Sequence, residues 1–284
     1  MTRRLGAVPY PHLRLSAAAR ALVLSNRRGW FDHVDGPLWP SVRAELRFAF
    51  KPPFDVISVV LINMSLALGA WFLINPDVVL NYTSLIFLPI ALASWAYSDV
   101  PATNLFGVRA EQIVEVLEQP ERVRRIMTVE NLSLWILVSP LCLLLAIGLL
   151  PSQHEPVMSM AIAVAVMCLP FTYLGLAAIV APLLPFHPLP WRERVRRRDT
   201  WPRYGLAVGI AYFGITWPAS LVSFTPVIII VGFVGTTPTH YFAAAVLATP
   251  WCLLTWRLGL LLSSRITKHR ANFLSEFLAD PTRG

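Results

Sequence analysis

Residues 157–184 read VMSMAIAVAVMCLPFTYLGLAAIVAPLL, and this run decides the class of fold. It carries no acidic or basic side chain, and it is longer than the roughly 20 residues that an α-helix needs to cross the hydrocarbon layer of a membrane. The whole chain has the same character, because 56% of its 284 residues are hydrophobic and only 14% are charged. Soluble domains carry about 25% charged residues. The sequence therefore predicts an all-α polytopic membrane protein.

The apolar runs predict six membrane-spanning helices. Their bounds are Val56–Ile74, Leu80–Tyr97, Leu132–Leu150, Val157–Leu184, Leu206–Phe224 and Tyr241–Leu262. Kinks are expected at the prolines inside these spans, which are Pro89, Pro140, Pro170, Pro182, Pro218 and Pro250. The apolar stretch 206–234 is too long for one ordinary crossing. We therefore expect Pro226 to break it and TPVIIIVGFVGTTP, residues 225–238, to form a short re-entrant helix between spans five and six.

The basic residues predict the orientation of these spans. Of 24 Lys and Arg residues, 23 lie in the segment before Phe54, in the segment between spans two and three, in WRERVRRRDTWPR (191–203), or after Leu262. The remaining one, Arg257, lies near the same end of the last span, from which its side chain can reach the headgroups. Since cytoplasmic segments are rich in Lys and Arg, both termini are predicted to be cytoplasmic. This pattern explains the net charge of +8 without nucleic-acid binding.

Three segments follow from these boundaries. Residues 1–52 form a cytoplasmic N-terminal segment, in which we expect no cleavable signal peptide. It ends in an interfacial helix with Val42 and Leu46 on one face and Arg43 and Arg47 on the other. Residues 53–264 form the transmembrane domain, with a charged elbow at 98–131 and a second cytoplasmic loop at 185–205. Residues 265–284 form a cytoplasmic tail.

The charged elbow reads as two short helices along the membrane surface. In the first, Ile113 and Leu117 lie on an apolar face, and Glu111, Glu115 and Glu118 lie on the opposite face. Pro120 is expected to turn the chain. The second helix then carries Val123, Ile126 and Met127 beside the basic residues Arg122, Arg124 and Arg125, before the third span begins. A solvated loop of mixed charge is the alternative interpretation of this segment.

Several motifs resemble the permease subunits of bacterial type-2 (ABCG-like) ATP-binding-cassette exporters. They are Asn104-Leu105-Phe106-Gly107, then Pro120, then Asn131-Leu132-Ser133-Leu134-Trp135, and the closing stretch WRLGLLLSSRITKHRANFLSEFLAD that ends at Asp280. The resemblance covers residues 41–280, and no single residue in it is diagnostic. It implies six spans, an amphipathic helix before the first, a coupling helix between the second and third, and short re-entrant helices between the last two.

The resemblance also implies partners. A second permease copy or a sister permease would complete the pathway, and a separate ATPase subunit would supply ATP hydrolysis with its own ATP and magnesium. The elbow would dock on that ATPase. The residues assigned to this docking site are Asn104, Phe106, Gly107, Arg109, Glu111, Glu115, Glu118, Arg122, Arg124 and Arg125. The implied location is the bacterial cytoplasmic membrane.

Motifs of other function classes are absent from the sequence. It has no G-x-x-x-x-G-K-[ST] phosphate loop, no H-E-x-x-H metalloprotease motif and no G-x-S-x-G nucleophile turn, so we expect a protein without its own catalytic or metal site. Cys142, Cys168 and Cys252 lie in apolar runs without C-x-x-C spacing and read as free thiols. Two alternatives remain: a scaffold subunit of an envelope-assembly complex, and a lipid-modifying enzyme, which the lack of a polar cluster disfavours.

Polar residues inside the spans are few. Asn63, Ser65, Thr216 and Ser220 are the candidates for lining a pathway, and helix-to-helix hydrogen bonding is the alternative role for them. No ionisable residue is placed at the centre of a span, which favours an external energy source over an internal proton relay. A hydrophobic or amphipathic substrate is expected from the apolar spans.

Overall fold

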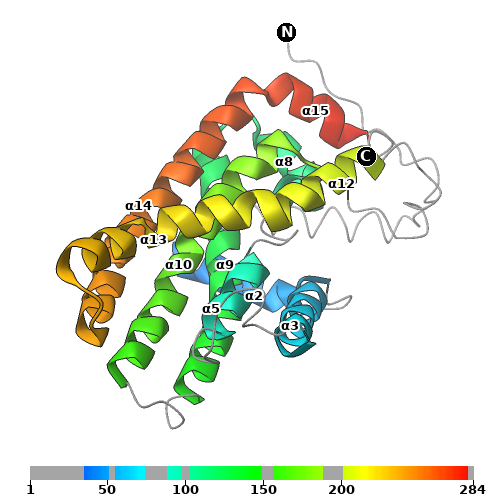
Figure 1. Ribbon diagram of the computed structural model, residues 1–284. Coiled ribbons are helices and arrows are strands. Elements are labelled where there is room, and N and C mark those ends of the chain that lie inside the picture. Colours follow the sequence, from blue (N-terminus) through cyan, green and yellow to red (C-terminus); the bar gives the residue numbers. More distant parts are fainter. Residues whose placement is uncertain are drawn as a thin grey trace.

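The computed structural model describes residues 35–50, 55–73, 88–97, 103–148, 156–187 and 201–280. Within these ranges the chain is helical and forms no strand (Figure 1). The elements are α2 (Leu38–Ala49), α3 (Asp55–Leu73), α5 (Leu88–Tyr97), α7 (Leu105–Val108), α8 (Ala110–Val116), α9 (Pro120–Gly148), α10 (Pro156–Leu183), α12 (Trp201–Gly209), η4 (Ile210–Ile215), α13 (Thr216–Val234), α14 (Pro238–His269) and α15 (Ala271–Ala279). The segment before Asp35, most of the loop 185–205 and the start of the second predicted span lie outside the described residues.

Among the described residues, four helical stretches are long and apolar enough to cross a membrane by length and composition. They are α9, α10, the continuous stretch Trp201–Val234, and α14. Each covers one of the last four predicted spans to within two residues, so the prediction of a multi-pass helical membrane protein is confirmed. α3 matches the first predicted span almost residue for residue, and α5 covers only the last part of the second. The total of six spans therefore stays a prediction.

The break predicted at Pro226 does not occur. A proline inside a helix cannot donate to the carbonyl four residues earlier, which here belongs to Val222. That carbonyl instead accepts a hydrogen bond of 2.8 Å from the indole Nε1 of Trp251 on α14. Because a neighbouring helix supplies the missing donor, α13 continues through Pro226 to Val234. The separate re-entrant helix predicted over residues 225–238 is therefore replaced by one long helix, which ends at Gly235 with φ 128°.

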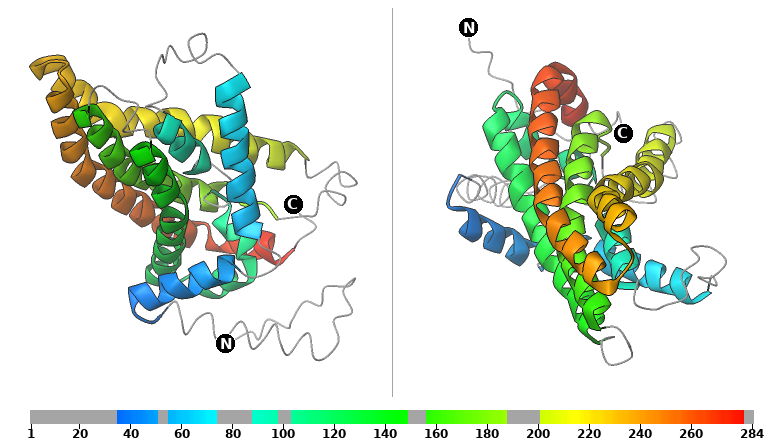
Figure 2. Two further views of the ribbon diagram at one scale, coloured as in Figure 1. Left: turned by 90° about the horizontal axis from the view of Figure 1, so that it is seen from below. Right: turned by 60° about the vertical axis from the view of Figure 1, so that its left-hand side comes forward.

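The centre of the fold is the pair α10 and α14, which lie along each other in both views of Figure 2. Their contacts occur in the same order along both helices: Cys168 with Thr249 (3.1 Å), Thr172 with Thr255 (3.0 Å), Gly175 with Gly259, and Ala178 with Ser263. The two helices are therefore parallel. Small residues and interhelical hydrogen bonds are the usual means by which helices associate in membranes. Spans four and six are expected to cross the membrane in the same direction, because span five returns between them. The parallel arrangement of α10 and α14 agrees with that expectation.

Gly175 and Gly259 set the distance between these two helices. A Cβ atom at Gly259 would lie 2.3 Å from the carbonyl oxygen of Gly175, and one at Gly175 would lie 2.8 Å from the Cα atom of Trp256. Neither position has room for a side chain. The two backbones are in direct contact at this level of the bundle.

α9 packs antiparallel against α10. Asn131 donates to the carbonyl of Leu174 at 3.4 Å, and Trp135 donates to the carbonyl of Met167 at 2.9 Å, so residues later in α9 meet residues earlier in α10. α2 lies across α9, and the structure confirms that it is amphipathic, with Val42 buried. Phe50, which follows the last residue of α2, is 60% exposed.

Candidate functional site: the charged elbow

The elbow consists of the short helices α7 and α8 and the first turns of α9 (Figure 1). Pro120 begins α9, as the sequence analysis expected, since a proline in the first turn has no N–H to lose. However, α9 runs from Pro120 to Gly148 without a stop. The predicted second elbow helix and the third span are therefore one rigid helix. The reason is that no residue from Glu121 to Asn131 is a helix breaker.

Asn104 joins the elbow to the end of α10. Its Nδ2 donates to the carbonyl of Phe186 at 2.8 Å, and its Oδ1 accepts from the N–H of Phe186 at 2.9 Å. The Asn104 residue is fully buried, as is Phe106. Gly107 is needed at the same contact, because a Cβ there would lie 1.8 Å from the Phe186 carbonyl oxygen. These three predicted docking residues thus fix the elbow to the bundle, and none of them is presented to a partner.

Arg109 lies in a buried ionic cluster that the sequence analysis did not foresee. Its guanidinium pairs with Glu45 of α2 and, at 3.1 Å, with Glu130 of α9. Burial alone would lower the pKa of Arg109, but the two carboxylates outweigh it and raise that pKa. Arg109 therefore ties α2, the elbow and α9 together. No local sequence pattern could have predicted this contact, because Glu45, Arg109 and Glu130 are far apart in the sequence.

The basic residues at the start of α9 have partners within the chain. Arg122 pairs with Asp35, Arg124 pairs with Glu121 one turn earlier, and Arg125 donates to the carbonyl of Gly36 at 2.7 Å. Two of these contacts hold the segment before α2 against α9. The cluster predicted to meet a partner is therefore largely committed to the chain itself.

The acidic residues of α8 are arranged differently. Glu115 and Glu118 are exposed, and Glu111 is partly exposed. On the opposite face Ile113, Val116 and Leu117 are buried. The predicted amphipathic character of α8 is confirmed, and its acidic side, which continues to Glu118 in the turn after it, is accessible.

The apolar face of α8 packs on the C-terminal helix α15. Leu274, Phe277 and Leu278 of α15 are buried in the same hydrophobic core as Ile113 and Val116. The sequence analysis placed residues 265–284 in a cytoplasmic tail and predicted no contact between this tail and the elbow. The LSEFL pattern, with apolar residues three and four apart, is the signal from which the helix could have been found.

The predicted pathway residues lie on two helices, Asn63 and Ser65 on α3 and Thr216 and Ser220 on α13. Asn63 is buried in α3, where it has a polar partner, and Ser65 is exposed on the same helix. Ser220 shares a hydrogen bond of 2.7 Å with Tyr173 of α10 and donates to the carbonyl of Thr216. For Ser220, the alternative role of joining helices therefore fits the geometry.

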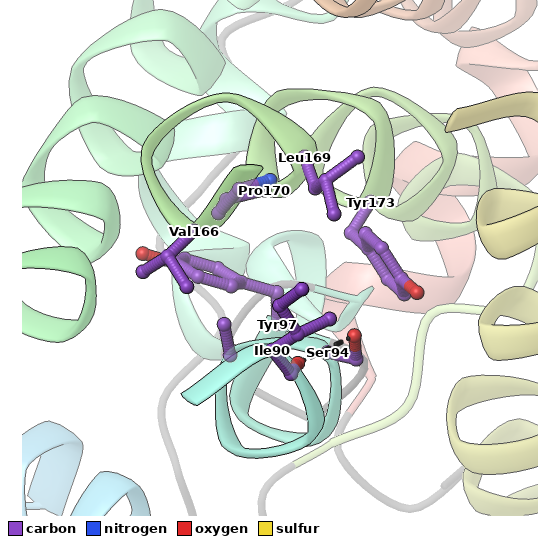
Figure 3. A pocket seen from close by; sticks show the side chains of 8 residues that line it. Ile90, Ser94, Tyr97, Val166, Leu169, Pro170 and Tyr173 are labelled. Carbon is purple, nitrogen blue, oxygen red and sulfur yellow. Dashed lines mark hydrogen bonds between the residues drawn. The ribbon is translucent and has the colours of Figure 1, made fainter. Parts of the chain in front are cut away.

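A small crevice lies between α5 and α10 (Figure 3). It is lined mainly by apolar side chains, together with Ser94, Tyr97 and Tyr173. None of the space between these side chains is wide enough for a water molecule. The hydroxyl of Tyr97 is bonded to Ser139 at 2.7 Å. The crevice is thus closed to a substrate in this conformation.

Comparisons with known proteins give no name to this arrangement. No family model, no curated protein and no solved structure matches the chain. Within the described residues, no group of three or more His, Cys, Asp or Glu side chains could hold a metal ion. Any functional assignment therefore rests on the residues and their geometry.

Proposed function

We propose that this chain is the membrane-spanning permease subunit of an ATP-driven exporter. In this proposal the elbow faces the cytoplasm and docks a separate ATPase subunit, where ATP and magnesium are bound. The observation that carries it is the construction of the elbow. One side of α8 is packed into the bundle through α15, and the other side exposes Glu115 and Glu118.

A docking element must transmit force as well as bind. The two hydrogen bonds between Asn104 and Phe186 connect the elbow to the end of α10. The ionic cluster of Arg109 connects it to α2 and α9. A displacement of α8 by a partner would therefore move these membrane helices, which a solvated loop would not do.

The exposed apolar residues are consistent with a second membrane-embedded subunit as well as with lipid. Large side chains on the stretch Trp201–Val234 are exposed, among them Phe213, Trp217, Leu221 and Phe233. In the proposal, two such chains pair in the cytoplasmic membrane of a bacterium and form the pathway between them. A hydrophobic or amphipathic substrate suits these apolar surfaces.

The docking proposal is tested by reversing the exposed charges. The double variant Glu115→Lys and Glu118→Lys should release an ATP-hydrolysing subunit that co-purifies with the wild-type chain from its own membranes in mild detergent. The matched control reverses two exposed charges on α2, Arg43→Glu and Arg47→Glu, and should retain that subunit. Equal retention by both double variants would refute the elbow as the docking site. The absence of any ATPase from the wild-type preparation would favour the scaffold alternative.

A further inference from the structure

Two arginines, Arg203 and Arg270, both contact the ring of Phe273. They lie near the C-terminal ends of α10 and α14 and the N-terminal end of α12. The guanidinium carbon of Arg270, at the end of α14, lies 4.6 Å from the ring centre of Phe273. That of Arg203, in the first turn of α12, lies 5.7 Å from the same centre. Arg203 also lies 3.9 Å over the ring of Phe277, which stacks on the imidazole of His187 at 5.1 Å. Both guanidiniums therefore lie against aromatic rings of α15.

Part of each guanidinium is used to cap helix ends. Nη1 of Arg270 donates to the last carbonyls of α10, those of Pro182 at 2.7 Å and Leu183 at 2.9 Å. Nε of Arg203 donates to the carbonyl of Pro185 at 3.0 Å. Capping of this kind is common at helix C-termini. It leaves both Nη groups of Arg203, and Nε and Nη2 of Arg270, without a partner among the described residues.

Neither arginine forms an ion pair with a carboxylate in the part of the chain that the structure describes. The ion pairs found there join Arg109 to Glu45 and Glu130, Arg122 to Asp35, and Arg124 to Glu121. Two like charges beside one apolar ring repel each other more strongly than they would in water. Phe273 is 41% exposed, so the site is open to a ligand. An anion between the two guanidiniums would relieve the repulsion and use the remaining donors.

The position of the pair indicates which anion is available. The predicted spans on α10 and α14 end at Leu184 and Leu262, so the arginines lie where a membrane helix meets the headgroups. Guanidinium groups bind phosphate through paired N–H donors. We propose that Arg203 and Arg270 form a binding site for the phosphate of an anionic phospholipid headgroup, with Phe273 against the glycerol region. This site is independent of the ATPase-docking proposal.

The test uses the full-length protein, purified in detergent and stripped of lipid. Short-chain phosphatidylglycerol is titrated while the thermal unfolding midpoint is followed. The midpoint should rise in the wild type, and Arg203→Gln should weaken the apparent affinity about tenfold or more, because charge-assisted hydrogen bonds are lost. The matched control is Arg265→Gln, which removes an equal charge from an exposed position on α14 and should bind as the wild type does. If Arg203→Gln does not fold, Arg203→Lys keeps the charge and should still lose several-fold affinity.

Two outcomes would overturn the site. One is an equal loss in Arg265→Gln and Arg203→Gln, because the binding would then follow net charge alone. The other is an equal rise with short-chain phosphatidylcholine, because its headgroup carries no net charge. A third arm uses inorganic phosphate alone. If it raises the midpoint as much as the lipid does at the same concentration, the ligand is a soluble phosphate and the assignment to lipid is wrong.

Discussion

Replacing Asn104 by alanine tests whether the elbow is fixed to the membrane helices. The change removes both hydrogen bonds to the buried backbone N–H and carbonyl of Phe186. A hydrogen bond lost at a buried site costs about 1 to 3 kcal/mol. We expect Asn104→Ala to favour opening of the elbow by about 2 to 4 kcal/mol, since part of the cost is relieved by water. That corresponds to roughly a thirtyfold to several-hundredfold increase in the open population.

The assay is hydrogen exchange of the amides of α7 and α8 in the purified protein. Amides in both helices should exchange faster by a factor in that range, while those in the middle of α14 should not change. Asn272→Ala is the matched control, because Asn272 lies exposed on α15 at the same end of the molecule. Asn104→Asp keeps the acceptor but places a carboxylate oxygen against the Phe186 carbonyl, and it should be at least as damaging. An unchanged exchange rate in Asn104→Ala would refute the proposed junction.

Three further predictions concern the bundle and its charged end. Gly259→Ala should lower the free energy of unfolding by about 1 to 3 kcal/mol, because its methyl group would collide with the backbone of Gly175; Gly148→Ala, where nothing lies within 4 Å, is the control. Trp251→Phe should cost about 1 kcal/mol, because it removes the donor that replaces the missing N–H of the proline in α13, and an unchanged midpoint of unfolding would contradict this. Burial lowers the pKa of His187 below 6.5, and a hydrogen bond to a backbone carbonyl opposes this shift only in part. As the pH falls, His187 is therefore protonated in the unfolded chain before it is protonated in the folded protein. Stability should therefore fall as the pH drops below about 6.5, and His187→Gln should flatten that fall in the thermal midpoint.

The membrane class and most helix positions could be predicted from the sequence. Runs such as 157–184 are so apolar and so long that few folds other than membrane helices accommodate them. The amphipathic pattern of α8 was also readable, because the spacing of Ile113 and Leu117 against Glu115 and Glu118 fixes which face is buried. Both inferences depend on local sequence patterns, which do not require knowledge of contacts between distant residues.

The contacts between distant residues could not be predicted in the same way. In the sequence, Pro226 predicts a helix break. In the structure, Trp251 donates to the carbonyl of Val222, which Pro226 leaves without a backbone donor, and the helix continues. Asn104 reads as a surface polar residue until Phe186, 82 residues later, is found to use both its donor and its acceptor. In both cases a tertiary hydrogen bond decides the role of the residue, and no local pattern records it.

The central claim is that the acidic side of α8 faces the cytoplasm and contacts an ATPase. The most direct measurement places a cysteine at Glu115 in the full-length chain and attaches a photo-activated crosslinker in native inside-out membranes. The account predicts a crosslinked partner that contains a phosphate-binding loop and hydrolyses ATP, and no labelling of position 115 by an impermeant reagent in intact cells. Labelling from the cell exterior, or capture of no ATPase from the inside-out membranes, would contradict it.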